Sequence, residues 1–184
     1  MVIIFHHPVL KSFSKSELPF RCPPDTNLVL TIIEWNMHCL LHNLPGIYHL
    51  NTYYPNAYTT FYSHPLFGES LVFLFFHKFL GFDITKSYIL YLLFAFWVGA
   101  LGTFLLAREL TRNRFVPFLA ALIFILFPFS RNSLSHLHSF SFFWVGFVFY
   151  YLLRFQKTGR LKEAIRAGIF IFIQGLFSIY HGYF

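Results

Sequence analysis

Residues 87–107 read "SYILYLLFAFWVGALGTFLLA" and contain no Asp, Glu, Lys or Arg. As an α-helix rising 1.5 Å per residue, this stretch would extend about 30 Å, which matches the hydrocarbon core of a bilayer. An uncharged run of this length predicts a transmembrane helix. We therefore take it as the first recognisable span and work outward from it.

The composition of the chain agrees with a membrane protein. It is 57% hydrophobic and 23% aromatic, includes 28 phenylalanines, and has 11% charged residues. Soluble domains usually contain about 25% charged residues, and a small core could not bury so many aromatic rings. The net charge of +7 is explained by the basic cytoplasmic loops of multi-pass proteins. We therefore expect a lipid bilayer as a partner and no nucleic acid.

Three further apolar runs follow residues 87–107. They cover about 115–130, 136–153 and 167–184. The prolines of the run 115–130 lie near its ends, where proline harms a helix least. The sequence therefore predicts a transmembrane helical region over 83–184. The fold class that we expect is an all-α, multi-pass transmembrane bundle.

The basic residues predict the orientation of these spans. Two loops are strongly basic, after the first and after the third span; between the second and third spans Arg131 is the one basic residue. The members of the two basic loops are Arg108, Arg112 and Arg114, then Arg154, Lys157, Arg160, Lys162 and Arg166. By the positive-inside rule both loops face the cytoplasm. The Arg131 region and the residues before Ser87 are then expected outside.

Residues 23–82 are expected to form an extracytoplasmic loop that contains interfacial helices. Apolar residues recur at helical spacing over 26–44, interrupted by polar ones, which predicts an amphipathic helix resting on the membrane. Residues 45–65 are rich in Pro, Asn, Thr and Tyr and predict an ordered loop with tyrosines at headgroup level. Residues 66–80 are read as a second interfacial helix. If that segment crossed the membrane instead, Asp25 would be cytoplasmic.

Several motifs occur in a suggestive order. Asp25 is followed by Trp35-Asn36, "YYPN", "FYSHPLFGES", a span that ends in "LLARELT", and "FPFSRNSLSHLHSF". This series resembles the N-terminal part of bacterial polytopic glycosyltransferases of the GT-C superfamily, which use dolichyl- or polyprenyl-phosphate sugars. The resemblance implies inverting transfer of a sugar from a polyprenyl-phosphate donor to an extracytoplasmic acceptor. It implies an inner-membrane location, with Asp25 outside as the general base.

The chain departs from the family's pattern in four ways. Pro24 precedes the aspartate where the family often has glycine, and His64-Pro65 stands where related chains often have Glu-His. The usual first transmembrane helix should precede Asp25, but residues 1–22 contain only a short apolar patch. The family also continues for several helices after its equivalent of Phe184. The resemblance therefore suggests an incomplete enzyme, and we expect the isolated chain to be inactive.

The chemistry of glycosyl transfer explains why a carboxylate is needed. An alcohol is a weak nucleophile, so its proton must be removed as it attacks the anomeric carbon. A partly desolvated carboxylate has the raised basicity that this step requires. An aspartate at the start of a helix is also a favoured N-cap, so both roles remain open for Asp25.

Further candidate substrate-binding residues lie on the same predicted outer side. Glu34 and Glu69 could orient the acceptor, and Arg131 could bind the lipid phosphate or extend to the headgroups. His64, His136 and His138 could hold a divalent metal ion or phosphate, or make interfacial hydrogen bonds. His136 and His138 are two residues apart, a spacing that a helix points in different directions but that an irregular loop could bring together. No cofactor is assigned, and a divalent metal ion remains an alternative.

A non-enzymatic transporter or channel subunit is the alternative function. Such proteins carry ionisable residues in the middle of their spans, and the four runs here have no Asp, Glu, Lys or Arg at their centres. The pattern therefore favours interfacial chemistry. Cys22 and Cys39 could form a disulfide or stay as two thiols, and the oligomeric state is open.

Overall fold

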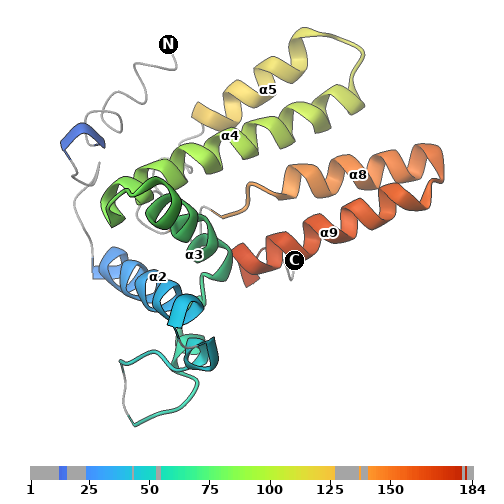
Figure 1. Cartoon of the computed structure of the whole chain (residues 1–184). Coiled ribbons are helices and arrows are strands. Elements are labelled where there is room, and N and C mark those ends of the chain that lie inside the picture. The colour runs from blue at the N-terminus through green and yellow to red at the C-terminus, as the bar shows by residue number, and fades with distance from the viewer. Residues whose placement is uncertain are drawn as a thin grey trace. The chain divides into compact units, whose positions relative to one another are not determined.

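The computed structural model describes residues 13–15, 24–42, 44–52, 55–126, 137, 141–179 and 181. Within these ranges the secondary structure is helical and contains no strand (Figure 1). The all-α expectation is therefore confirmed for the part of the chain that the structure describes. The chain divides into two compact units, residues 1–91 with 135–138 and residues 92–134 with 139–184.

The first unit is organised around helix α2, Pro24–His42, which confirms the helix predicted over 26–44. A face of α2 is buried at Val29, Ile32, Ile33 and Asn36. Helix α3, Phe67–Leu74, packs against α2 and continues as a turn of π-helix, Phe75–Phe79. The segment predicted as a second interfacial helix is thus helical from Phe67 onward.

The loop between α2 and α3 is ordered by hydrogen bonds to its own backbone. It contains two 3₁₀ helices, η1 at Leu44–Tyr48 and η2 at Thr59–Tyr62. The hydroxyl of Thr60 donates to the carbonyl of Ile47 at 2.8 Å, and the hydroxyl of Thr59 donates to that of Leu50 at 2.8 Å. These bonds hold η2 against the end of η1 and give the described residues of this loop the order that was expected.

Helix α4, Ile84–Leu110, contains the stretch 87–107. Its 27 residues correspond to about 40 Å of helix. In the described part of the chain it is the one helix long and apolar enough to cross a membrane. The Asp83 carboxylate accepts the backbone N–H of Lys86 at 2.8 Å, which satisfies a donor of the first turn.

The other apolar runs form shorter helices with different boundaries from those predicted. Helix α5 is Phe115–Leu126, about 18 Å long, and residues 127–130 of the predicted second span lie outside the described residues. Helix α8 is Val145–Thr158 rather than 136–153, and α9 is Leu161–Phe177 rather than 167–184. Helix α8 thus begins nine residues after the predicted start of the third span, and α9 begins six residues before that of the fourth.

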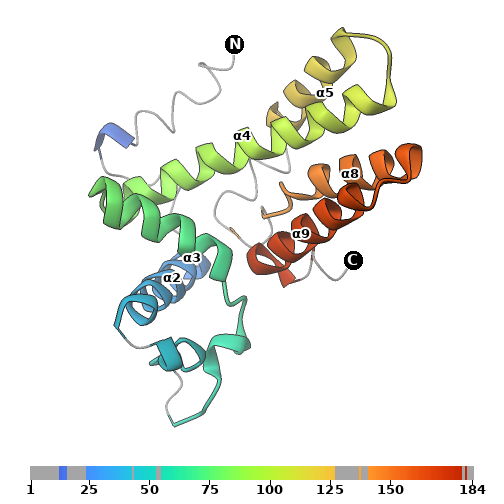
Figure 2. The same cartoon turned by 45° about the vertical axis from the view of Figure 1, so that its right-hand side comes forward.

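The shift has a local physical cause. Residues 154–166 were taken as a loop because they are basic, yet most of them are helical. Gly159 has φ 62°, a left-handed conformation that ends α8, and its N–H donates to the Phe155 carbonyl. The chain then reverses into α9, which packs alongside α8 (Figure 2). The helical hairpin therefore includes the charged residues on both sides of the turn.

Glycine and aromatic contacts hold the second unit together. A Cβ on Gly146 of α8 would lie 2.7 Å from the carbonyl carbon of Gly102 in α4, so these two backbones approach closely. A Cβ on Gly99 would overlap the ring of Phe124. Close packing therefore occurs at Gly99 and Gly102. At Gly168 and Gly175, no atom of the described residues lies within 4 Å of a Cβ.

Candidate functional site

Asp25 is the second residue of α2. It therefore belongs to the first helical turn rather than to the N-cap position that precedes a helix. A negative charge in a first turn is stabilised by the positive end of the helix dipole. The location at the start of a helix is as expected, and the roles of Asp25 as a helix cap and as a base stay predictions.

Glu34 lines a cavity of about 320 Å³ in the first unit. The cavity brings side chains of α2 together with one from the following loop: Thr31, Glu34, Trp35, His38 and Asn51. Sequence reasoning selected Glu34 but missed His38 and Asn51. Thr31, Glu34 and His38 recur at a spacing of three and four residues on one helix face, a signal that was available. The participation of Asn51 depends on how the loop folds back.

The aromatic wall of this cavity is held in place. The indole Nε1 of Trp35 donates to the Gly46 carbonyl at 3.1 Å, across the turn from α2 to η1. The ring of His38 lies 6.0 Å from the Trp35 ring and 5.1 Å from the ring of His42. Because one edge of the indole is anchored, its face has a fixed direction. The cavity therefore has a preformed aromatic surface beside a carboxylate.

Asp25 and Glu34 are separated along α2. Their positions are nine residues apart in the numbering, which corresponds to about 14 Å along the helix axis. Both residues belong to the same rigid element. If Asp25 acts on a reacting hydroxyl, Glu34 and its cavity would contact a more distant part of the same molecule.

His64 and Glu69 are buried rather than exposed at a surface. The side chain of Glu69 has no exposed area and that of His64 is 8% exposed. Their neighbours in the sequence, Pro65 and Ser70, are bonded to Asn36, whose Nδ2 donates to the Pro65 carbonyl at 2.6 Å and to the Ser70 hydroxyl at 3.0 Å. Two of the motif segments, Trp35-Asn36 and "SHPLFGES", thus meet in space.

This cluster of Asn36, His64, Glu69 and Ser70, here named the buried polar cluster, includes two residues that sequence reasoning missed. Asn36 was treated as an interruption of the apolar pattern of α2. It follows Val29, Ile32 and Ile33 on the buried face, and a polar residue at such a position normally has a partner. That spacing was a usable signal for Asn36. Ser70 had no comparable signal.

The backbone beside the cluster is strained. Leu66 has φ 51°, in the left-handed region, and its side chain is 1% exposed. This conformation costs a non-glycine residue about 1–2 kcal/mol. The Leu66 carbonyl accepts both the N–H and the hydroxyl of Ser70, at 2.9 and 2.7 Å. The hydrogen bonds on either side of Leu66 therefore hold it in an unfavourable conformation.

Three candidate residues lie outside the described residues: Arg131, His136 and His138. Their proposed roles remain predictions. Among the residues that the structure describes, no group of three or more His, Cys, Asp or Glu side chains is close enough to hold a metal ion. Cys39 is a buried free thiol, and burial raises the pKa of this thiol. Cys22 is outside the described ranges.

The first unit thus combines a polar, aromatic-walled cavity with a separate buried polar cluster. The cavity has the groups needed to bind a polar molecule with an apolar face, because it offers hydrogen-bonding side chains and an indole ring. Compared with known proteins, the chain matches no family model, no curated protein and no solved structure.

Proposed function

We propose that this chain acts in a polytopic membrane glycosyltransferase of the GT-C type. The reaction is the inverting transfer of a sugar from a polyprenyl-phosphate donor to a hydroxyl on the extracytoplasmic side. The observation that carries the proposal is the cavity of about 320 Å³ between α2 and its following loop. The ordered motif series of the sequence motivates the specific reaction.

The cavity suits a sugar ring for three reasons. Its volume is within the range of small-molecule sites, roughly 300–1,000 Å³. The anchored Trp35 ring offers a flat apolar face to the C–H face of a pyranose. Glu34, Asn51 and Thr31 offer oxygen and nitrogen atoms that can bond to sugar hydroxyls.

Asp25 is proposed as the general base. It would remove the proton of the attacking hydroxyl as that oxygen bonds to the anomeric carbon and the lipid phosphate departs. Binding of a remote sugar unit near Glu34, about 14 Å along α2, would contribute to orienting the acceptor at Asp25. The buried polar cluster would hold the segment 64–70 in position rather than react.

The membrane setting is supported by surfaces that would be unfavourable in water. Besides the length of α4, large apolar side chains are widely exposed on the described helices, including Trp97 at 78%, Phe115 at 83% and Phe172 at 67%. Exposed rings in this number indicate contact with lipid or with protein. The multi-pass arrangement with Asp25 outside completes the proposal.

The binding step can be tested on the full chain in detergent micelles. A short-chain polyprenyl-phosphate mannose and a soluble mannobiose would be titrated while Trp fluorescence is recorded. We expect Glu34→Gln to weaken binding of at least one of them by about tenfold, as for a hydrogen bond to a charged group. Asp83→Asn is a matched control, since it removes the same charge and asparagine also caps a helix.

Two results would argue against the proposal. Equal affinity of the wild type and Glu34→Gln would remove the cavity from the binding site. Saturable transport of a solute across vesicles without sugar binding would favour the transporter alternative. The chemical step is tested in membranes that contain the complete enzyme. There, Asp25→Asn should abolish sugar transfer and leave membrane insertion of the protein unchanged.

A further inference from the structure

A second cavity lies in the other unit, at the turn between α4 and α5. Its volume is about 510 Å³. Three arginines line it, Arg108 at the end of α4 and Arg112 and Arg114 in the turn. Asn113 and the rings of Phe104 and Phe118 complete the lining. This cavity is independent of the proposed glycosyl transfer, which we assign to the first unit.

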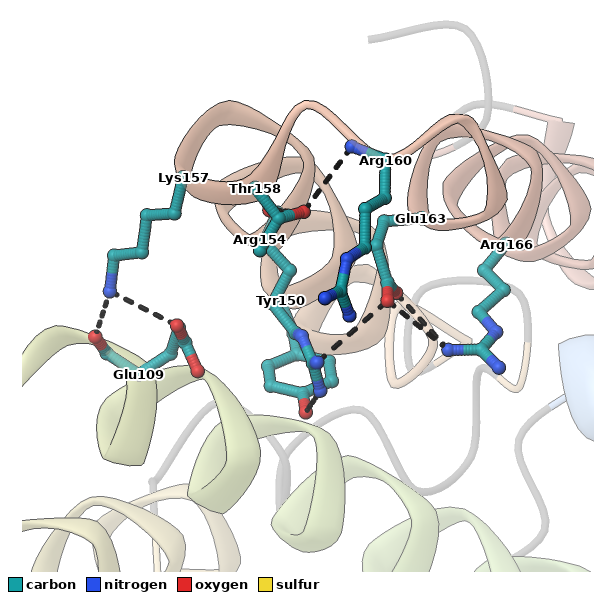
Figure 3. A network of polar contacts seen from close by, with 8 residues as sticks. All are labelled: Glu109, Tyr150, Arg154, Lys157, Thr158, Arg160, Glu163 and Arg166. Carbon is teal, nitrogen blue, oxygen red and sulfur yellow. Dashed lines mark hydrogen bonds and ion pairs between the residues drawn. The ribbon is translucent and has the colours of Figure 1, made fainter.

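The three arginines have no carboxylate partner among the described residues. Glu109 is the one acidic residue in this stretch of chain, residues 104–118. Its carboxylate is engaged elsewhere, because Lys157 of α8 lies 3.1 Å from Glu109 Oε1 and also donates to the Glu109 carbonyl at 2.6 Å (Figure 3). Within the described part of the chain, no carboxylate therefore compensates the positive charge around the cavity.

The other basic turn of this unit is arranged differently. Between α8 and α9, Arg154 and Arg166 lie 3.7 and 3.2 Å from the carboxylate of Glu163, whose side chain is 1% exposed (Figure 3). Arg154 also donates to the Tyr150 hydroxyl at 2.9 Å. Two adjacent basic turns thus differ in kind. At the α8–α9 turn, Glu163 pairs with part of the positive charge. At the α4–α5 turn, the arginines line a cavity instead.

The α4–α5 turn has a defined shape. The Asn113 side-chain oxygen accepts the N–H of Phe115 at 2.8 Å, and the Asn113 N–H donates to the Thr111 hydroxyl at 3.2 Å. The ring of Phe104 packs edge-to-face on that of Phe118 at 5.0 Å. The cavity therefore combines a fixed polar turn with an aromatic wall.

We propose that this cavity binds the headgroup of an anionic phospholipid. Guanidinium groups bind phosphate through paired N–H donors. The Phe104 and Phe118 rings would contact the start of the acyl chains, and the exposed Phe115 and Leu119 would continue this apolar surface. A soluble phosphate compound would satisfy the arginines but leave the rings without a partner. The combination of both surfaces selects an amphiphile with a phosphate.

The experiment measures lipid binding by the full chain in a neutral detergent. Dioctanoyl phosphatidylglycerol, dioctanoyl phosphatidylcholine and glycerol 3-phosphate would each be titrated and the bound fraction followed by native mass spectrometry. We expect phosphatidylglycerol to bind at least about tenfold more tightly than either of the other two. Each membrane-proximal arginine contributes roughly fivefold, so Arg112→Gln/Arg114→Gln should weaken phosphatidylglycerol binding by about 25-fold.

The matched control is Arg160→Gln/Lys162→Gln. This variant removes the same charge from the neighbouring basic turn, at two exposed residues that do not line the cavity. It should change phosphatidylglycerol affinity by less than about threefold, since general attraction is weak in neutral micelles. Equal losses in the two variants would overturn the proposal in favour of a diffuse basic surface. Equal affinity for glycerol 3-phosphate would overturn it in favour of a soluble ligand.

Discussion

The two units of this chain bring helices together by opposite means. In the first unit, α2 meets α3 through the buried polar cluster, where the Asn36 amide bonds to Pro65 and Ser70 at 2.6 and 3.0 Å. In the second unit, α4 meets α8 through Gly102 and Gly146, where the backbones themselves are in contact. In a chain so rich in phenylalanine, apolar contact alone fits many arrangements. The hydrogen bonds of Asn36 in the first unit, and the glycines without side chains in the second, then select one arrangement of the helices.

The largest effect is expected from filling the glycine contact. In Gly146→Val, the new Cβ would lie 2.7 Å from the Gly102 carbonyl carbon and 3.0 Å from the Thr103 nitrogen. Backbone atoms cannot move away as a flexible side chain can, so we expect a loss of at least about 3 kcal/mol. The measurement is thermal unfolding in detergent, followed by size-exclusion chromatography.

Gly168→Val is the control for this contact. No described residue lies within 4 Å of a Cβ at Gly168, and glycine is a poor helix former. This variant should be as stable as the wild type or slightly more so. Similar destabilisation of the two variants would show that the α4–α8 contact is not the reason for glycine at 146.

The next effect tests the polar contact of the first unit. Asn36→Ala leaves the buried Pro65 carbonyl and the Ser70 hydroxyl without the Asn36 amide, which should cost about 2 kcal/mol. Asn36→Leu keeps most of the side-chain volume but removes the same hydrogen bonds, so this variant should lose stability too. Thr31→Ala, an exposed position on the same helix, should change stability by less than about 0.5 kcal/mol. If Asn36→Leu were as stable as the wild type, apolar packing would be sufficient in this unit.

A smaller effect is expected where charges join two helices of the second unit. Glu163→Gln keeps the size of the side chain but removes the charge that faces Arg154 and Arg166. Both arginines are partly exposed and can be hydrated in the variant, so the loss should be less than for Asn36→Ala. Glu109→Gln, at a more exposed pair, should lose less still. Thermal midpoints ranked in the opposite order would contradict this account of the hairpin.

The smallest effect concerns the buried thiol on α2. Burial raises the pKa of Cys39, so the reactive thiolate should stay scarce until the pH exceeds that raised value. The unfolded thiol ionises at its ordinary, lower pKa, so stability should fall slightly as the pH rises between the two values. Maleimide labelling of a Cys22→Ser variant should be slow at neutral pH and fast in denaturant. Rapid labelling of the folded protein would show that Cys39 is accessible.

Much of the helical framework could be predicted from the sequence. The long uncharged run predicted α4, and the apolar spacing predicted α2, because both signals are local. The boundaries of α8 and α9 were missed because charged residues were read as a loop. The structure pairs Arg154 and Arg166 with Glu163, and paired charges are compatible with helices. The pair of Arg154 with Glu163 crosses a turn and is not visible in hydropathy.

The candidate site was predictable to a lesser extent. Glu34 does line a cavity, and its helical neighbours Thr31 and His38 follow from spacing on α2. Asn51 joins them only because the loop returns to the helix, with Trp35 bonded to Gly46. Gly146 was missed for a similar reason, since its partner Gly102 lies 44 positions earlier in the chain. Local periodicity identifies a face of a helix but does not identify what packs on it.

The contact between Gly102 and Gly146 also limits how α4 can change in length. Each residue of an α-helix turns the chain by about 100°. One residue inserted or deleted between Gly99 and Gly102 would therefore rotate one of these glycines away from its packing partner, while the other kept its position. A side chain would then face the α8 backbone where none can fit. Homologous chains that keep this crossing should therefore tolerate substitutions along α4 far better than single-residue insertions in its second half.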